Sequence, residues 1–251
     1  MINRRLALSA VLLAPVALRA AESVPADARA LAREELLHND WPNLRRYRDA
    51  NLALASGSAQ VVFMGDSITE GWSVKSPALF STGRVNRGIS GQTSPQMLVR
   101  FRHDVIALKP RVVHIMAGTN DVAGNTGPST VEMIQANIMS MVELAQAHSI
   151  AVILASIPPA ASFPWRPEVE AVAPIASMNA WLARYSSERQ LVYADYFSAL
   201  SDGAGGIRKG LADDGVHPTA AGYAVMNPLA DAAIAKALGS KRTAGCRATD
   251  L

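Results

Sequence analysis

The chain has 251 residues, of which 49% are hydrophobic and 18% charged; this suits one large globular domain and excludes a largely disordered protein. The formal net charge is +3, but the first 20 residues hold three basic and no acidic side chains, so their removal would leave 21 residues of each sign. The sequence therefore lacks the excess of positive charge that is typical of a nucleic-acid-binding protein. A single cysteine, Cys246, excludes an internal disulfide and a paired-cysteine metal site.

The N-terminus has the layout of a secretory signal. Residues 1–5 are basic, residues 6–18 are apolar apart from Ser9, and alanines follow at positions 20 and 21. The apolar run is short for a bilayer span. We therefore expect a signal peptide over 1–20 and a periplasmic or secreted protein, exported by the Sec route or, given the arginine pair, by the twin-arginine route. A short membrane anchor or a buried helix is the alternative.

After this segment, helical spacing of apolar residues predicts helices over 26–39 and 43–55. We expect residues 21–58 to form an N-terminal helical segment that packs on the main domain. Short apolar runs then alternate with longer helical patterns. The sequence predicts strands over 61–64, 84–89, 111–116, 150–156 and 191–194, and helices over 95–108, 128–147, 174–189 and 218–238.

This alternation is typical of a parallel sheet covered by helices on both faces. No repeat or linker divides the chain after residue 59. We predict a single α/β domain over 59–238, a three-layer α/β/α sandwich around a five-stranded parallel sheet, with a small polar tail over 239–251. In such sheets the chemistry lies beyond the carboxyl ends of the strands, so the loops there are the places to search for a site.

Ser67 stands in the first of these loops, two residues after the strand over 61–64 ends at Gly65. A helix that begins there would offer backbone N–H groups and positive potential to an anionic intermediate. Ser67 is therefore a candidate nucleophile for ester hydrolysis. The alternative is that Ser67 is only a helix N-cap, a position that serines commonly occupy.

Asp214 and His217 lie three residues apart in the loop before the last helix. This spacing lets the carboxylate hold one ring nitrogen while the other faces the site, which is what a catalytic base needs. The neighbouring Asp213 competes for the carboxylate role. A capping aspartate and a surface histidine are the alternative.

Two further loops offer donors for a developing oxyanion. Gly91 follows the second strand, where the absence of a side chain lets the backbone N–H approach a substrate oxygen. Asn120 follows the third strand, and its amide can donate without adding charge. Each residue also fits an ordinary turn.

Four stretches carry a resemblance to a known family. Gly65-Asp66-Ser67-Ile68 and residues 86–91, 118–121 and 214–218 resemble, in order, the four sequence blocks of the GDSL or SGNH hydrolases, over about residues 59–238. The resemblance implies a flavodoxin-like sandwich and an esterase or lipase activity without a cofactor. It implies Ser67 as nucleophile, His217 as base, Asp214 as carboxylate, and Ser67 N–H, Gly91 N–H and the Asn120 side chain as oxyanion donors. Ile68 replaces the leucine of the family's name.

The resemblance is closest to the platelet-activating-factor acetylhydrolase-like and carbohydrate acetylesterase branches, which implies short acyl groups, acetyl above all, on a small molecule or a carbohydrate. Phe163 and Trp165, in the proline-rich loop 157–173, would roof a small apolar pocket; an ordinary surface loop is the alternative. Longer-chain esters including lysophospholipids, acyl transfer to a sugar, and a non-catalytic carbohydrate-binding role stay open.

The partners we expect are confined to the ester substrate. Nucleic acid, and a stable membrane insertion after signal removal, are not expected, while a homo-oligomer stays open. The sequence holds no metal motif of the His-Glu-x-x-His kind and no phosphate-binding P-loop.

Overall fold

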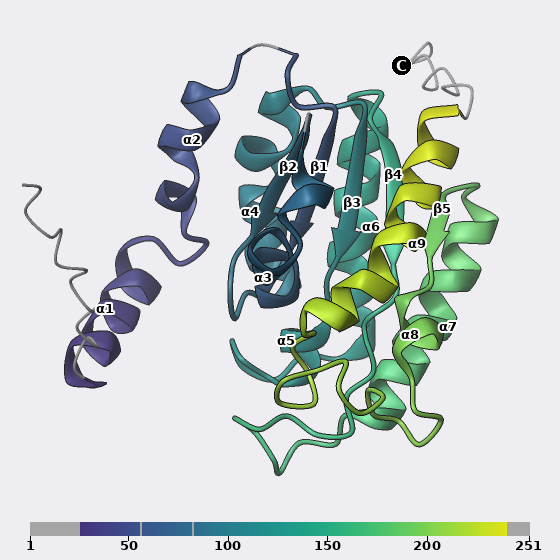
Figure 1. Ribbon diagram of the computed structural model, residues 1–251. Coiled ribbons are helices and arrows are strands. Elements are labelled where there is room, and N and C mark those ends of the chain that lie inside the picture. Colours follow the sequence, from purple (N-terminus) through teal and green to yellow (C-terminus); the bar gives the residue numbers. More distant parts are fainter. Residues whose placement is uncertain (1–25, 56, 82, 240–251) are drawn as a thin grey trace, which may run out of the picture. The chain divides into compact units, whose positions relative to one another are not determined.

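The computed structural model describes residues 26–55, 57–81 and 83–239 (Figure 1). The predicted signal peptide and Cys246 lie outside the described residues. The chain divides into two compact units, residues 1–39 and 40–251. In the first, the described residues form helix α1 (Ala26–Asn39), as the sequence predicts. The boundary falls inside the segment 21–58, and the packing of α1 on the main domain stays a prediction.

The second unit is built on a five-stranded parallel sheet (Figure 1). Its strands are β1 (Val61–Gly65), β2 (Arg84–Gly88), β3 (Val112–Met116), β4 (Ala151–Ala155) and β5 (Val192–Ala194). The strand order β2-β1-β3-β4-β5 is that of flavodoxin-like folds, which confirms the predicted fold class. Gly65 pairs with Gly88 and with Met116, so β1, β2 and β3 end together at one edge of the sheet.

Helices cover both faces of this sheet (Figure 1). One layer contains α4, α6 and α7, which contact one another in that order, and the other contains α3, α8 and α9. Their bounds, with that of the short α5, are α3 (Ser67–Lys75), α4 (Ser94–Asp104), α5 (Thr119–Val122), α6 (Val131–Ala147), α7 (Val172–Glu188), α8 (Tyr196–Leu200) and α9 (Ala220–Gly239). No helix of the described ranges combines the length and the apolar character needed to cross a membrane.

Several elements differ from the prediction. The helix expected over 43–55 is interrupted at Tyr47, whose backbone angles are φ −115° and ψ 4°, and consists of a 3-10 turn, η1 (Leu44–Arg46), and α2 (Arg48–Ala53). Helix α6 begins after Thr130 rather than at 128, because the Thr130 side chain accepts a hydrogen bond from the backbone of Met133. The helix predicted over 95–108 ends at Asp104 and is followed by a separate 3-10 turn, η3 (Ile106–Leu108). The short α5, α8 and η2 (Pro77–Phe80) contain too few residues to show a helical period.

Two glycines at the strand ends let α3 approach the sheet closely. A Cβ atom on Gly65 would lie 2.0 Å from Thr69 Oγ1, and one on Gly88 would lie 2.2 Å from the backbone nitrogen of Glu70. Both distances are far below van der Waals contact, so neither position has space for a Cβ atom unless α3 moves. The first turn of α3, and with it Ser67, is thus seated directly on the ends of β1 and β2.

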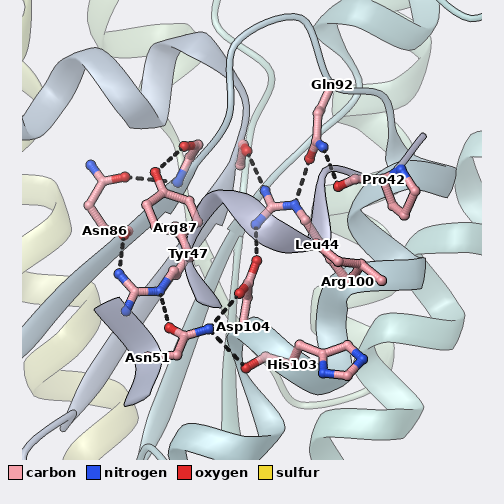
Figure 2. A network of polar contacts seen from close by, with 12 residues as sticks. Pro42, Leu44, Tyr47, Asn51, Asn86, Arg87, Gln92, Arg100, His103 and Asp104 are labelled. Carbon is pink, nitrogen blue, oxygen red and sulfur yellow. Dashed lines mark hydrogen bonds and ion pairs between the residues drawn. The ribbon is translucent and has the colours of Figure 1, made fainter. Parts of the chain in front are cut away.

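A buried polar network ties residues 40–55 to the sheet (Figure 2). The fully buried Arg100 donates to Gln92 Oε1 (2.5 Å), to Asp104 Oδ2 (2.9 Å) and to the carbonyl of Gly65 (3.0 Å). Asn51 donates to Asp104 (2.8 Å) and accepts from Arg87 (2.8 Å). The remaining links are Tyr47 Oη to the carbonyl of Gly88 and Gln92 Nε2 to the carbonyl of Pro42 (2.8 Å). Each buried charge therefore has partners, as its burial requires.

Candidate active site

Ser67 is the first residue of α3, immediately beyond the end of β1. The helix is capped by Asp66, whose Oδ1 accepts a hydrogen bond from the backbone of Ile68 (2.9 Å), so the alternative that Ser67 is the N-cap is wrong. The hydroxyl of Ser67 is therefore not used to cap the helix. It lies 2.9 Å from Nε2 of His217.

The other nitrogen of the His217 ring, Nδ1, lies 2.8 Å from Oδ2 of Asp214. Oδ1 of the same carboxylate accepts the backbone N–H groups of Val216 (3.0 Å) and His217 (2.8 Å). Partial burial alone would raise the pKa of Asp214, but these bonds and the bond to the ring together lower the pKa below its ordinary value. An ionised Asp214 can therefore hold the ring with Nδ1–H toward it and Nε2 toward Ser67.

Asp213, the competitor for the carboxylate role, has a different partner. Its carboxylate pairs with Lys75, which also donates to the carbonyl of Pro218 (3.0 Å). The geometry thus brings Asp214 and not Asp213 to the histidine.

The backbone N–H groups of Ser67 and Gly91 have no acceptor among the described residues. Gly91 has a φ of +77°, a conformation that favours glycine. Unpaired backbone N–H groups are the kind of donor that an oxyanion site uses.

Asn120 is buried and lies against both loops. Its Nδ2 donates to the carbonyl of Gln92 (3.0 Å) and approaches Oδ2 of Asp66 (3.3 Å). The two hydrogens of this amide already have acceptors in the free protein, unlike the two backbone donors. Donation to a substrate oxygen would replace one of these contacts.

Asp66 is a buried acid that the sequence analysis did not single out. Burial raises the pKa of its carboxyl to about 6, against the opposing effects of the Ile68 hydrogen bond and the nearby His217. Its place in the Gly-Asp-Ser stretch was visible in the sequence, but its burial was not.

The two predicted pocket residues differ in exposure. The Trp165 ring lies with its centroid 5.8 Å from that of His217 and is 38% exposed. Phe163 is fully buried and contacts Trp165 from behind, at a centroid distance of 5.5 Å. Only Trp165 therefore offers surface beside the histidine. Asn125, which sequence reasoning missed, accepts a hydrogen bond from Trp165 Nε1 (3.0 Å).

A cavity of about 530 Å³ lies elsewhere, where β3 and β4 begin, and includes Lys109, Arg111 and His148. That is the edge of the sheet opposite to Ser67, so the cavity has no part in the site. Within the described residues, no cluster of three or more histidine, cysteine, aspartate or glutamate side chains has an arrangement that could hold a metal ion.

A serine hydroxyl bonded to an imidazole, which is bonded in turn to a carboxylate, is the arrangement of serine hydrolases. Residues 63–225 match the model of the GDSL-like lipase/acylhydrolase family. The chain belongs to this family, whose members are hydrolases that act on esters.

Solved structures agree with this membership. The chain is 48% identical to a protein of Bacteroides fragilis NCTC 9343 that is provisionally assigned as an acylhydrolase, with a TM-score of 0.76 over 79% of this chain and 99% of that one. It is 46% identical to a GDSL-like lipase of Bacteroides thetaiotaomicron VPI-5482, with a TM-score of 0.76 over 79% of this chain and 100% of that one.

A shorter match is to the uncharacterized lipoprotein YqeF of Bacillus subtilis (strain 168), 38% identical over 73 residues. This match spans 28% of the present chain and 30% of the lipoprotein.

Proposed function

We propose that the protein is a serine esterase that hydrolyses short-chain acyl esters, with acetyl esters of carbohydrates as the expected natural substrates. The observation that carries the proposal is the pair of contacts from Ser67 Oγ to His217 Nε2 (2.9 Å) and from His217 Nδ1 to Asp214 Oδ2 (2.8 Å). A role in binding alone would need none of these three groups in contact.

In the first step, His217 takes the proton of Ser67 as the serine oxygen attacks the ester carbonyl. The N–H groups of Ser67 and Gly91 receive the negative charge that forms on the carbonyl oxygen, and Asn120 adds a third donor by giving up its bond to Gln92 or Asp66. The protonated His217, stabilised by Asp214, gives its proton to the departing alcohol. An acyl group then remains on Ser67.

In the second step, His217 takes a proton from water, and the resulting hydroxide equivalent attacks the acyl carbonyl. The tetrahedral intermediate collapses, the acid leaves, and the proton returns to Ser67. A sugar hydroxyl in place of water would give acyl transfer by the same route. No step requires a cofactor.

The preference for a short acyl group is supported by Trp165. Its ring lies beside His217 and contacts the buried Phe163, and we expect this aromatic pair to limit the acyl chain length. The 46% identity to a protein described as a lipase favours a second candidate, hydrolysis of longer acyl chains. Export of the protein is proposed from its N-terminal sequence and fits the partial match to a lipoprotein.

The test is a series of p-nitrophenyl esters from acetyl to dodecanoyl, assayed with the wild type and with Ser67→Ala. We expect kcat/KM to fall steeply beyond butyrate and Ser67→Ala to lose activity by about 10⁴-fold or more while remaining folded by circular dichroism. A maximum of kcat/KM at long acyl chains would instead favour the second candidate, hydrolysis of longer acyl chains. Near wild-type activity of Ser67→Ala would exclude the serine mechanism.

The two neighbouring aspartates provide a matched control. Asp214→Asn should lower kcat by about 10³- to 10⁴-fold, because an amide favours the wrong tautomer of His217. Asp213→Asn removes only the exposed ion pair with Lys75 and should leave kcat within about threefold. Equal losses in the two variants would contradict the assignment of the carboxylate.

A further inference from the structure

Asn125 lies three residues beyond the end of α5, in the turn that follows Asn120. Its half-buried side chain makes three hydrogen bonds, and each of them reaches a different part of the site. Nδ2 donates to Oδ1 of Asn120 (2.8 Å) and to the carbonyl of Gly91 (3.2 Å), and Oδ1 accepts from Nε1 of Trp165 (3.0 Å). No role that we have proposed so far uses this residue.

The bond to Asn120 settles which way that amide faces. With Asn120 Oδ1 held by a donor, Nδ2 is directed toward the carbonyl of Gln92 and the carboxylate of Asp66. The reversed amide would place its oxygen against these two acceptors and its nitrogen against the Asn125 donor. Donation to Asn120 Oδ1 also polarises the amide and strengthens Nδ2 as a donor.

The bond to Gly91 acts on the second loop. Ser90, on one side of Gly91, is held by Glu70, which accepts from the Ser90 backbone (2.9 Å) and hydroxyl (2.5 Å). Gln92, on the other side, is held by Arg100. Gly91 itself has φ of +77° and an unpaired N–H, and the contact from Asn125 to its carbonyl is the side-chain bond that fixes this peptide.

The hydrogen bond from Trp165 Nε1 connects Asn125 to the aromatic ring that lies beside His217. Because one amide group contacts this indole and both donor loops, a shift of any one of them must disturb the others. Positions that differ by a few tenths of an ångström matter here, since an oxyanion donor must lie within hydrogen-bond distance of the atom that acquires charge.

We propose that Asn125 is a positioning residue that holds Asn120, the Gly91 peptide and Trp165 in register around the reacting carbonyl. The inference rests on the proposed function of the Ser67 site and deepens it. Asn125 acts through its neighbours and does not itself touch the substrate carbonyl.

The first variant is Asn125→Ala, assayed with p-nitrophenyl acetate. We expect kcat to fall by about 10- to 100-fold with KM changed by less than about threefold, because misplaced donors weaken the transition state more than the bound ester. The inhibition constant of a trifluoromethyl ketone, whose adduct with Ser67 carries an oxyanion, should rise by a similar factor. Titration with a reactive phosphonate should still label one serine per chain.

Two further variants separate the contacts. Asn125→Asp places carboxylate oxygens against Asn120 Oδ1 and the Gly91 carbonyl, so its activity relative to wild type should rise as the pH falls from 8 to 5 and the new acid gains a proton that it can donate. Trp165→Phe keeps a ring but loses the Nε1 donor, and should alter KM and chain-length preference more than kcat.

The matched control is Asn137→Ala. Asn137 is also partly buried, and its Nδ2 donates to Ser94 Oγ (3.0 Å), which belongs neither to the proposed triad nor to the proposed oxyanion donors. We expect kcat of this variant within about twofold of wild type. The proposal would be overturned if Asn125→Ala had the same kcat and inhibitor affinity as Asn137→Ala. It would also be overturned if the activity of Asn125→Asp relative to wild type did not change with pH.

Ser67→Ala in the same assay separates the proposed serine mechanism from the positioning role of Asn125. An active Ser67→Ala overturns the proposed function and this inference with it. An inactive Ser67→Ala beside an unaffected Asn125→Ala overturns the inference alone.

Discussion

At the scale of single residues, the site depends on polar groups whose partners come from other loops. Asp66 illustrates this dependence. It caps α3, receives the Asn120 amide and lies near His217, yet it is 1% exposed. A carboxyl in such a place is worth testing through the pH dependence of stability, because burial penalises its charged form.

The pKa of Asp66 is about 6 in the folded protein and near the ordinary 3.8 in the unfolded chain. The folded state therefore binds more protons between these values, and Asp66 lowers the free energy of unfolding as the pH rises from 4 to 6. Asp66→Asn keeps a capping side chain and removes this titration. Relative to wild type, its free energy of unfolding in urea should rise by up to about 3 kcal/mol from pH 4 to pH 7.

The control is Asp195→Asn, which makes the same exchange at the N-cap of α8, where Asp195 accepts from the backbone of Ser198 (3.0 Å). Its difference from wild type at each pH provides the baseline. The baseline is subtracted from the difference in free energy of unfolding between Asp66→Asn and wild type. If the remaining difference does not change with pH, the buried carboxyl does not titrate as expected.

At the scale of elements, the position of Ser67 follows from how α3 is seated. The strand-end glycines bring the helix backbone against β1 and β2, so Ser67, the proposed nucleophile, is placed by packing. Replacing Gly88 with alanine would put Cβ 2.2 Å from the Glu70 nitrogen and 2.7 Å from the Asp66 carbonyl oxygen.

We expect Gly88→Ala to lower the free energy of unfolding by about 1–3 kcal/mol or more, because backbone atoms cannot move aside as a side chain can. Since α3 must shift, kcat should fall as well. Urea unfolding and the acetate assay measure the two effects. Gly239→Ala is the control, because its Cβ meets nothing within 4 Å. A stable and fully active Gly88→Ala would contradict this account of how α3 packs on the ends of β1 and β2.

The elements also show what a sequence can and cannot predict. Each of the five strands was predicted to within two residues of its bounds, because parallel strands buried on both faces form apolar runs between turns. The interruption at Tyr47 was not predicted; the Tyr47 hydroxyl donates to the carbonyl of Gly88, 41 residues away, and no local pattern reveals such a contact. The candidate triad residues Ser67, Asp214 and His217 could be named because each stands in a short stretch that resembles a family block, and such stretches are local signals. Asn125 was missed because the sequence Gly124-Asn125-Thr126-Gly127 is typical of a turn, and the role that we propose for it depends on three contacts distant in the chain or hidden in the fold.

At the scale of the whole molecule, residues 40–55 belong with the sheet although they precede it in the chain. The network in Figure 2 attaches them to β2 and α4 through Tyr47, Asn51 and the carbonyl of Pro42. Removing them would leave two buried donors, Arg87 Nε and Gln92 Nε2, without the acceptors that Asn51 and Pro42 now provide. Loss of a hydrogen-bond partner by a buried polar group lowers the free energy of unfolding more than loss of an exposed ion pair does.

This predicts a difference between two truncated proteins, one beginning at residue 40 and one at residue 56. The shorter protein should have a free energy of unfolding lower by several kcal/mol, through the several buried hydrogen bonds that it lacks, each worth about 1–3 kcal/mol. Urea unfolding of both proteins checks this. Equal stabilities would mean that the network contributes nothing to folding.

Ser67 and His217 are separated by 150 positions in the chain, and their contact forms only when the loop before α9 meets the start of α3. A ribosome that has produced the entire parallel sheet has still not supplied the proposed base. During synthesis, and at any stage of export in an extended form, the chain therefore holds its serine without the means to activate it. In refolding experiments, recovery of ester hydrolysis should report the docking of the last fifth of the chain, later than signals from the sheet.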